Sequence, residues 1–421
     1  MLTLSKAKKS QGAIKGFAED FIVEEIAPNG ILIERNKIYT RDNFPIQSDA
    51  VAEQKFSVFI LQKMNWNTVQ ALRAVAKRFR RGIRSTGFAG TKDRNSISTQ
   101  MCSIYGVTPE MLASVHVKDT SINGAWPSST GVKLGDLLGN RFTIKIRDIK
   151  EQLGLDGILG ELNNVFPNYF GEQRFGNREN NAQIGIDILR GDFESAAMHF
   201  LTDCTNEISQ DAIEARQRLD MERDFKSAIE YFPSYLKYER AVIEYLHRFA
   251  GNYANAMRML PRAILLMFVH SVEDYLFNKE LEMRVKDGLI GPQGEDLVCE
   301  ADFYGFPALS KTRKYGEDGY GKEVFVVGNI VGYDTELNSI ERDLLEELGI
   351  DNKMFALKRM PELNCKGSHR VFFAPFKDFN QKFDENGNLM LSFSLPAGSY
   401  ATTLLKEFVD YETKQMPASL S

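Results

Sequence analysis

The stretch Arg141-Phe-Thr-Ile-Lys-Ile-Arg147 alternates strictly between polar and apolar side chains. Successive side chains of a β-strand point to opposite faces of a sheet, so Phe142, Ile144 and Ile146 share one face of this segment. The alternation predicts a strand whose apolar face is buried in a core.

The first part of the chain predicts more of a sheet, together with one helix. Apolar, β-branched runs favour strands at four places: Phe21–Ile26, Ile31–Glu34, Ser57–Leu61 and Ser96–Tyr105. Asn67 and Thr68 can cap an amphipathic helix that ends near Gly82. Its apolar residues recur at helical spacing, at Val69, Leu72, Val75, Ala76 and Phe79.

The composition and pattern of the sequence are different between about Asn180 and about Met360. Long, charged helical stretches such as Glu207 to Tyr231 and Tyr238 to Phe249 predict a second domain there. The tail from Leu391 to Phe408 is typical of a strand, a tight turn and a helix, a unit too small to fold alone. We expect it to complete the sheet of the first domain.

Length and composition limit the class of protein. A chain of 421 residues, 43% hydrophobic and 26% charged, is typical of a globular protein with two or three domains. Its four cysteines lie far apart, its start lacks the apolar segment of a signal peptide, and its longest apolar run is too short for a bilayer. We expect a cytoplasmic protein with no membrane segment.

The charged side chains opposite the apolar stripe of the helix that follows Asn67 are all positive. Five of them lie near one face: Arg73, Lys77, Arg80, Arg81 and Arg84. Exposed helices usually mix Glu with Lys, so in a chain of net charge −5 this stripe favours contact with nucleic-acid phosphates. The alternative is an ordinary solvated helix face.

The segment Gly87-Phe-Ala-Gly-Thr-Lys-Asp-Arg94 predicts a tight turn with an acidic residue between two cations. Lys92 and Arg94 favour the carboxylate form of Asp93, which makes it a candidate nucleophile or base close to bound phosphates. A surface aspartate in a local ion pair is an equally good interpretation of these residues alone.

A third cluster, Phe166-Pro-Asn-Tyr-Phe-Gly-Glu-Gln-Arg-Phe-Gly176, is rich in aromatic and amide side chains. An aromatic ring can stack on a splayed base, and Asn or Gln can hydrogen-bond to a base edge. These rings can also be core residues, and we expect some to be buried and at least one to face a pocket.

Two other patterns carry little weight. Gly316-Glu-Asp-Gly-Tyr-Gly-Lys322 has P-loop spacing, but Glu323 stands where a magnesium-binding Ser or Thr belongs, so a plain glycine loop is expected. The five histidines show no metal-ligand spacing and are expected to be structural.

Five segments occur in an order that resembles the TruD family of tRNA pseudouridine synthases. They are Lys15 with Glu19–Glu25, Gly87–Arg94, Gly139–Phe142, Asn168–Gly171 with Gln173–Gly176, and Leu395–Thr402. The resemblance spans most of the chain. Between about Asn180 and Met360 it is one of position only, because the family carries an insertion domain there.

The resemblance implies an α+β fold: a pseudouridine synthase catalytic domain with a mixed, largely antiparallel sheet and an inserted α/β TRUD domain. Residues 1–180 and 361–421 would form the catalytic domain, and residues 181–360 the insertion. It also implies an isomerase acting on tRNA, typically at uridine 13, and the long insertion resembles archaeal or eukaryotic members.

Roles for single residues follow from the same resemblance. Asp93 would act at the ribose C1′ as a nucleophile or as the base of an elimination, with Lys15 as its cationic partner. Phe170 would stack on the base and Asn168 would hold the base edge or the Asp93 loop, and Tyr169, Lys92 and Arg94 would contact the substrate. An isomerisation needs neither cofactor nor metal. The competing hypotheses are a nucleic-acid N-glycosylase and a tRNA-binding factor without chemistry.

Overall fold

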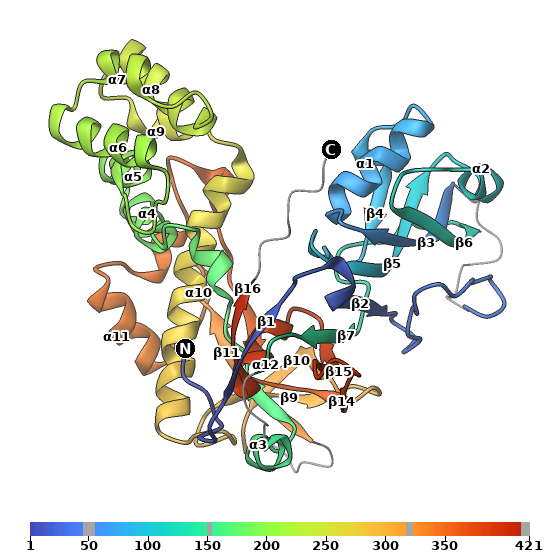
Figure 1. Ribbon diagram of the computed structural model, residues 1–421. Helices are drawn as coiled ribbons and strands as arrows, with labels where there is room; N and C mark the ends of the chain where they lie inside the picture. The colour runs from blue at the N-terminus through green and yellow to red at the C-terminus, as the bar shows by residue number, and fades with distance from the viewer. Residues whose placement is uncertain (45–54, 150–153, 317–322, 414–421) are drawn as a thin grey trace. The chain divides into compact units, whose positions relative to one another are not determined.

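The chain forms two compact units in the computed structural model, which describes residues 1–44, 55–149, 154–316 and 323–413 (Figure 1). The sheet unit comprises Thr3–Pro167, Glu300–Ala308 and Phe373–Ser421. The helical unit comprises Met1–Leu2, Asn168–Cys299 and Leu309–Phe372. The sheet unit therefore takes its strands from both ends of the chain, and most of the helical unit is inserted between them.

An eight-stranded sheet organises the sheet unit, in the order β14-β15-β7-β2-β5-β3-β6 with β4 beside β5. Neighbouring strands are antiparallel except for the parallel pair β2 and β5. The strands are β2 (Phe21–Ile26), β3 (Phe56–Met64), β4 (Thr86–Phe88), β5 (Ile97–Tyr105), β6 (Thr120–Ser128), β7 (Gly139–Ile146), β14 (Lys377–Phe383) and β15 (Leu389–Pro396).

The alternating stretch at residues 141–147 forms most of β7, as predicted. Phe142, Ile144 and Ile146 are buried, while the intervening Thr143 and Lys145 are half-buried. The prediction for the tail is confirmed as well. β15 pairs with β7 along its whole length, with Phe393 opposite Phe142, and α12 (Ala401–Phe408) follows the turn. The chain then forms β16 (Val409–Thr413), which pairs in parallel with β1 (Ser10–Ile14).

Helix α1 (Thr68–Arg78) packs on β3 and β5, with Ala71, Leu72, Val75 and Ala76 in the shared core. Asn67 caps it by accepting a hydrogen bond from the Gln70 amide, as predicted. The helix ends earlier than the expected Gly82, because Arg80 has a left-handed backbone (φ 54°) that an α-helix does not accommodate.

The helical unit contains a group of helices around one end of the long helix α10 (Figure 1). Its helices are α4 (Asn181–Arg190), α5 (Phe193–Thr202), α6 (Gln210–Glu222), α7 (Phe225–Tyr231), α8 (Lys237–Arg248), α9 (Tyr253–Met257), α10 (Arg262–Lys286) and α11 (Ser339–Glu347). A four-stranded sheet has the order β10-β9-β11-β12, formed by β9 (Leu297–Ala301), β10 (Pro307–Lys314), β11 (Val324–Ile330) and β12 (Ser368–Val371).

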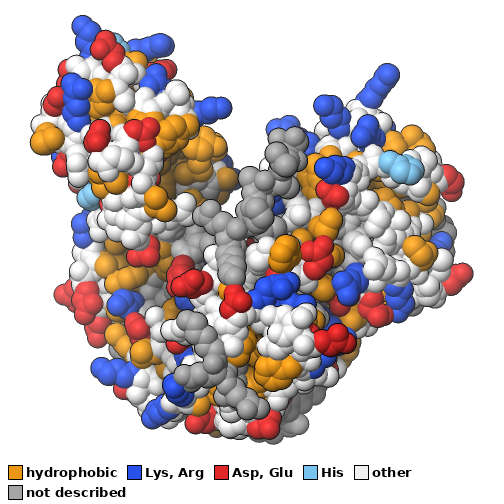
Figure 2. Space-filling view, viewed as in Figure 1, with side chains coloured by type: hydrophobic (Ala, Val, Ile, Leu, Met, Phe, Trp, Pro, Cys, Tyr) orange, Lys and Arg blue, Asp and Glu red, His pale blue; other side chains and the backbone are white. Residues whose placement is uncertain are grey.

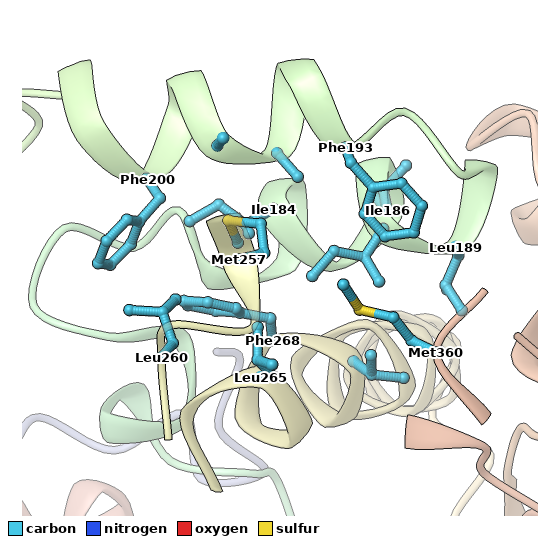
Figure 3. Packing of buried hydrophobic residues seen from close by; sticks show 14 of the residues in the cluster. Ile184, Ile186, Leu189, Phe193, Phe200, Met257, Leu260, Leu265, Phe268 and Met360 are labelled. Atoms are coloured by element: carbon cyan, nitrogen blue, oxygen red, sulfur yellow. The ribbon is translucent and has the colours of Figure 1, made fainter. Parts of the chain in front are cut away.

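The helices enclose a single large apolar cluster. Figure 3 shows Phe200 of α5 above Phe268 of α10 and Phe193 of α5 beside Ile186 of α4, with Met257 and Met360 in the same cluster. Burial of this many apolar side chains is the main favourable term in folding such a helical unit.

Two sequence predictions were wrong in detail. The Ile31–Glu34 segment is not a strand: Leu32 forms one isolated bridge to Ile26. The expected helix from Glu207 to Tyr231 is two helices, α6 and α7, because Arg223 adopts a left-handed conformation (φ 52°) between them. Apart from Gly316, the expected glycine loop lies outside the described residues.

Short elements complete the chain. They are α2 (Pro109–Ala113), α3 (Leu155–Leu162), the paired β8 (Val165–Pro167) and β13 (Phe373–Pro375), and the 3₁₀ turns η1 (Ala18–Asp20), η2 (Ile83–Ser85), η3 (Glu172–Phe175), η4 (Asn352–Phe355) and η5 (Pro361–Leu363). Among the described residues, no helix has the length and apolar content needed to cross a membrane.

Candidate active site

Asp93 lies between β4 and β5 in the sheet unit, and its side chain is 57% exposed. The Lys15 ammonium donates a 3.0 Å hydrogen bond to Asp93 Oδ2. Lys15 follows β1, its own side chain is buried, and its Nζ lies 4.5 Å from the centre of the Phe21 ring. The structure thus brings together Asp93 and its expected cationic partner, Lys15, and leaves the carboxylate accessible.

A buried lysine that sequence reasoning missed, Lys63, supports the backbone at Asp93. Lys63 of β3 is fully buried, and its Nζ donates to the carbonyl oxygens of Trp66 at 2.6 Å, Asp93 at 3.1 Å and Lys92 at 3.4 Å. Burial, followed by repulsion from Lys92, lowers the pKa of Lys63 to about 8. These bonds hold the loop against β3.

Lys92 anchors the same loop from the other side. Its ammonium lies 2.7 Å from Glu25 Oε2, and both side chains are buried. Glu25 also accepts a 2.9 Å hydrogen bond from the Met101 amide, and Thr68 accepts one of 2.9 Å from the Lys92 amide. This geometry does not support a substrate contact by Lys92, because its charge is used inside the protein. Arg94, in contrast, is exposed.

Gly87 does not form the tight turn expected at this segment. It lies in β4 opposite Ser103 of β5, and a Cβ at this position would overlap the carbonyl oxygen of Val132. Glycine is therefore needed for close approach of two backbones. The close packing of β4 leads directly into the loop that carries Asp93.

All five cations proposed to contact RNA are exposed. Arg73 and Lys77 lie on α1, while Arg80, Arg81 and Arg84 lie in the turn after it and in η2. Figure 2 shows Lys and Arg side chains gathered over α1. The helix also contacts the loop that carries Asp93, through Thr68 and Lys92. One local structure thus carries both the cationic surface and the support for Asp93.

The aromatic loop belongs to the helical unit from Asn168 onward, and most of it is buried. Asn168, Tyr169 and Phe170 are between 2% and 6% exposed. Phe166 is buried in the sheet unit, and Phe175 is half-buried. The expectation that several rings are core residues is confirmed.

Arg370, a second residue that sequence reasoning missed, holds this loop. Its guanidinium donates to Asn168 Oδ1 at 2.6 Å and to the Asn168 carbonyl at 3.0 Å, and it lies 4.2 Å above the Phe170 ring. Asn278 of α10 accepts a hydrogen bond from the Phe170 amide and donates one to its carbonyl. Phe277 meets the Phe170 ring edge-on at 5.5 Å. Asn168 is therefore a support of the loop in this structure.

The chain matches one known protein family over most of its length. The sequence model for tRNA pseudouridine synthase D (TruD) matches residues 2–408. The chain belongs to the TruD family. Its fold is accordingly the α+β fold of TruD enzymes, which are isomerases that act on tRNA uridine. The resemblance seen in five sequence motifs is confirmed.

Archaeal TruD proteins are similar to this chain over nearly their whole length. A "Probable tRNA pseudouridine synthase D" of Thermococcus sibiricus is 35% identical over 432 residues, covering 96% of each chain. One of Methanococcoides burtonii is 33% identical and covers 86% of this chain and 89% of its own. A TruD crystal structure from Methanosarcina mazei superposes with a TM-score of 0.75 at 30% identity, covering 97% of this chain and 95% of the other.

Proposed function

We propose that this TruD family member converts uridine to pseudouridine, at position 13 of tRNA, with Asp93 acting at the ribose C1′. The observation that carries the proposal is the Asp93 carboxylate itself. It is exposed, one of its oxygens is held 3.0 Å from Lys15, and its backbone is fixed by Lys63. A carboxylate positioned before the substrate arrives is what a reaction at a buried sugar carbon requires.

The reaction breaks the N1–C1′ bond and forms a C5–C1′ bond in the same nucleoside. In the nucleophilic route, an Asp93 oxygen bonds to C1′ as the uracil anion leaves. The freed base rotates and its C5 attacks C1′, releasing the carboxylate. C5 loses its proton and N1 gains one, so atoms and electrons balance without a redox partner. In the elimination route, Asp93 instead takes a proton from the sugar and later returns it.

Lys15 has a positioning role in either route. Its side chain is 9% exposed and its ammonium bonds Asp93 Oδ2, so the carboxylate is held in one orientation while its other oxygen approaches the sugar. A buried cation next to a reacting carboxylate also favours whichever state carries more negative charge on that carboxylate. The uridine has to leave its base stack to reach this group.

The loop from Asn168 to Phe170 is proposed to contact the flipped base. Stacking on an aromatic ring contributes about 1–3 kcal/mol per base. Arg370 and Asn278 set the position of the Phe170 ring and backbone, so little conformational entropy remains to be lost when RNA binds. The exposed cations of α1 are proposed to contact tRNA phosphates, and the cytoplasm is the proposed location.

The decisive experiment compares wild-type protein with the Asp93→Asn variant on an unmodified tRNA transcript. We expect pseudouridine, detected by carbodiimide primer extension, with wild type only, and tRNA affinity within about twofold for both proteins. Pseudouridine formation near the wild-type rate by the variant would exclude the role of Asp93. Release of free uracil by the wild type would indicate an N-glycosylase, and binding without any product would indicate a tRNA-binding factor.

A further inference from the structure

Three side chains with different ligand atoms meet in the helical unit. His270 and Glu273 lie one helical turn apart on α10, and Cys365 lies between η5 and β12. An imidazole nitrogen, a carboxylate oxygen and the Cys365 Sγ lie within 4.8 Å of one another. Among the described residues, this is the one group of three such ligands.

Two of the three side chains lie in the protein interior. Glu273 is 6% exposed and Cys365 is 7% exposed. Burial raises the pKa of Glu273 to about 8, and burial together with the Glu273 carboxylate raises the pKa of the Cys365 thiol well above its ordinary value. The positive charge of Arg174 opposes this rise in the pKa of Glu273, and Arg174 also forms an ion pair with Asp274 at 3.4 Å. A metal cation would take the place of the protons that the buried Glu273 and Cys365 otherwise hold.

The third ligand is of a kind suited to a metal ion. His270 is half-buried, and a neutral imidazole has one ring nitrogen with a free lone pair. A neutral imidazole beside a thiol and a carboxylate is a donor set that proteins use for transition metals.

We propose that His270, Glu273 and Cys365 bind a zinc ion. Zinc accepts sulfur, nitrogen and oxygen ligands at about 2.0–2.3 Å, so its tetrahedral ligands lie about 3.5 Å apart, a distance that small side-chain rotations reach from the observed 4.8 Å limit. The thiolate and the carboxylate together balance the +2 charge. Cys365 loses its thiol proton and Glu273 its carboxyl proton to solvent on binding, and a water molecule takes the fourth position. The thiolate favours zinc over magnesium or calcium.

The site would join two segments that also hold Phe170. Glu273 precedes Phe277 and Asn278 on α10, and Cys365 precedes Arg370 on the segment that enters β12. A zinc ion would fix the two segments to each other and so stabilise the helical unit. It is a structural role, independent of the chemistry proposed for Asp93, and it holds whether or not that proposal is correct.

The test uses the full-length protein stripped of metal with a chelator. Zinc is titrated against a chromophoric chelator, and bound zinc is counted by mass spectrometry. We expect one zinc ion per chain with a submicromolar dissociation constant, and roughly 100-fold weaker binding by Cys365→Ser and by Glu273→Gln. The matched control, Cys204→Ser, removes a half-buried thiol of the same unit and should bind like the wild type.

A second readout does not depend on the stability of the variants. Cobalt in the wild type and in Cys204→Ser should give a thiolate-to-metal charge-transfer band, and zinc should raise the melting temperature of both proteins. Glu273→Gln replaces a buried carboxyl group with an uncharged amide of nearly the same shape, so its stability should be close to that of the metal-free wild type, while it should fail to gain stability from zinc. Wild-type protein that binds zinc no tighter than about 10 μM, or Cys365→Ser that binds as tightly as the wild type, overturns the proposal in favour of a carboxyl–thiol hydrogen bond.

Discussion

Lys63 donates a 3.1 Å hydrogen bond from its buried ammonium to the carbonyl oxygen of Asp93. The bond connects strand β3 of the eight-stranded sheet to the residue proposed to react with the sugar. It is a bond to the backbone, so it fixes where Asp93 sits and leaves its carboxylate free for Lys15 and the substrate.

The titration of Lys63 should appear in the pH dependence of stability. Its pKa is about 8 in the folded protein against an ordinary 10.5, so between these pH values the unfolded chain binds more protons. The free energy of unfolding should therefore rise with pH across this window, by an amount on the order of 3 kcal/mol for this group. Lys63→Met should lose that rise in urea unfolding at pH 7.5 and 10.5, whereas the exposed Lys118→Met should keep it. An identical slope in wild type and Lys63→Met contradicts the assignment.

Removal of the Lys15 ammonium should affect the chemical step more than binding. We expect Lys15→Met to lower kcat by about 100-fold with KM within threefold, since Lys15 bonds Asp93 directly. Single-turnover measurements of pseudouridine in tRNA provide the rates. Lys15→Arg keeps the charge and should recover part of the loss. A selective rise in KM would instead place Lys15 in tRNA binding.

Loss of the α1 cations should weaken tRNA binding in a salt-dependent way. Each phosphate contact contributes about 0.7–0.9 to the slope of log affinity against log salt concentration. The double variant Arg73→Ala/Lys77→Ala should reduce that slope by about 1.5, as measured by filter binding between 50 and 200 mM salt. Lys382→Ala, an exposed cation of β14, is the control and should leave the slope unchanged. Equal slopes for the double variant and the wild type would rule out this surface.

Even the conservative replacement of Arg370 by lysine should lower the activity. Lysine keeps the positive charge but cannot make both bonds to Asn168 while covering the Phe170 ring. We expect Arg370→Lys to lower kcat by at least about tenfold with little change in tRNA affinity. Arg218 stacks on Tyr231 at the same 4.2 Å in the same unit, so Arg218→Lys controls for loss of a stacked guanidinium. If both variants are fully active, the loop does not need this support.

Gly87→Ala should destabilise the sheet unit. The added Cβ would meet the Val132 carbonyl, a backbone atom that cannot move without shifting its neighbours. Overpacking of this kind costs about 1–3 kcal/mol, which should appear as a lower melting temperature. Gly157→Ala, with open space around the added methyl group, should not lower it.

Local patterns in the sequence predicted most of the sheet unit. The alternation at residues 141–147 and the strand, turn and helix of the tail are properties of neighbouring residues, so they could be identified without the fold. The break at Arg223 could not, because no glycine or proline marks it.

The candidate site was predicted only in part, because the residues that hold its loops in place come from distant segments of the chain. Asp93 was a candidate from its place in a glycine turn between two cations, and its role and its partner Lys15 came from the family motifs. Lys63 lies within a strand and Arg370 lies some 200 residues from Asn168, so no spacing pattern connects them to the loops they hold. The same applies to Cys365, which meets His270 and Glu273 only in the folded chain.

The position of β15 has a consequence for synthesis of the protein on the ribosome. β15 is hydrogen-bonded to β7 over Leu389–Pro396, so until those residues emerge β7 is an edge strand with unpaired backbone groups and a row of apolar side chains. All of the helical unit except Met1–Leu2 is translated in that interval, and it can fold first. Closing the sheet is then a late, long-range event, and the nascent chain is most exposed to aggregation and to chaperones just before it is complete.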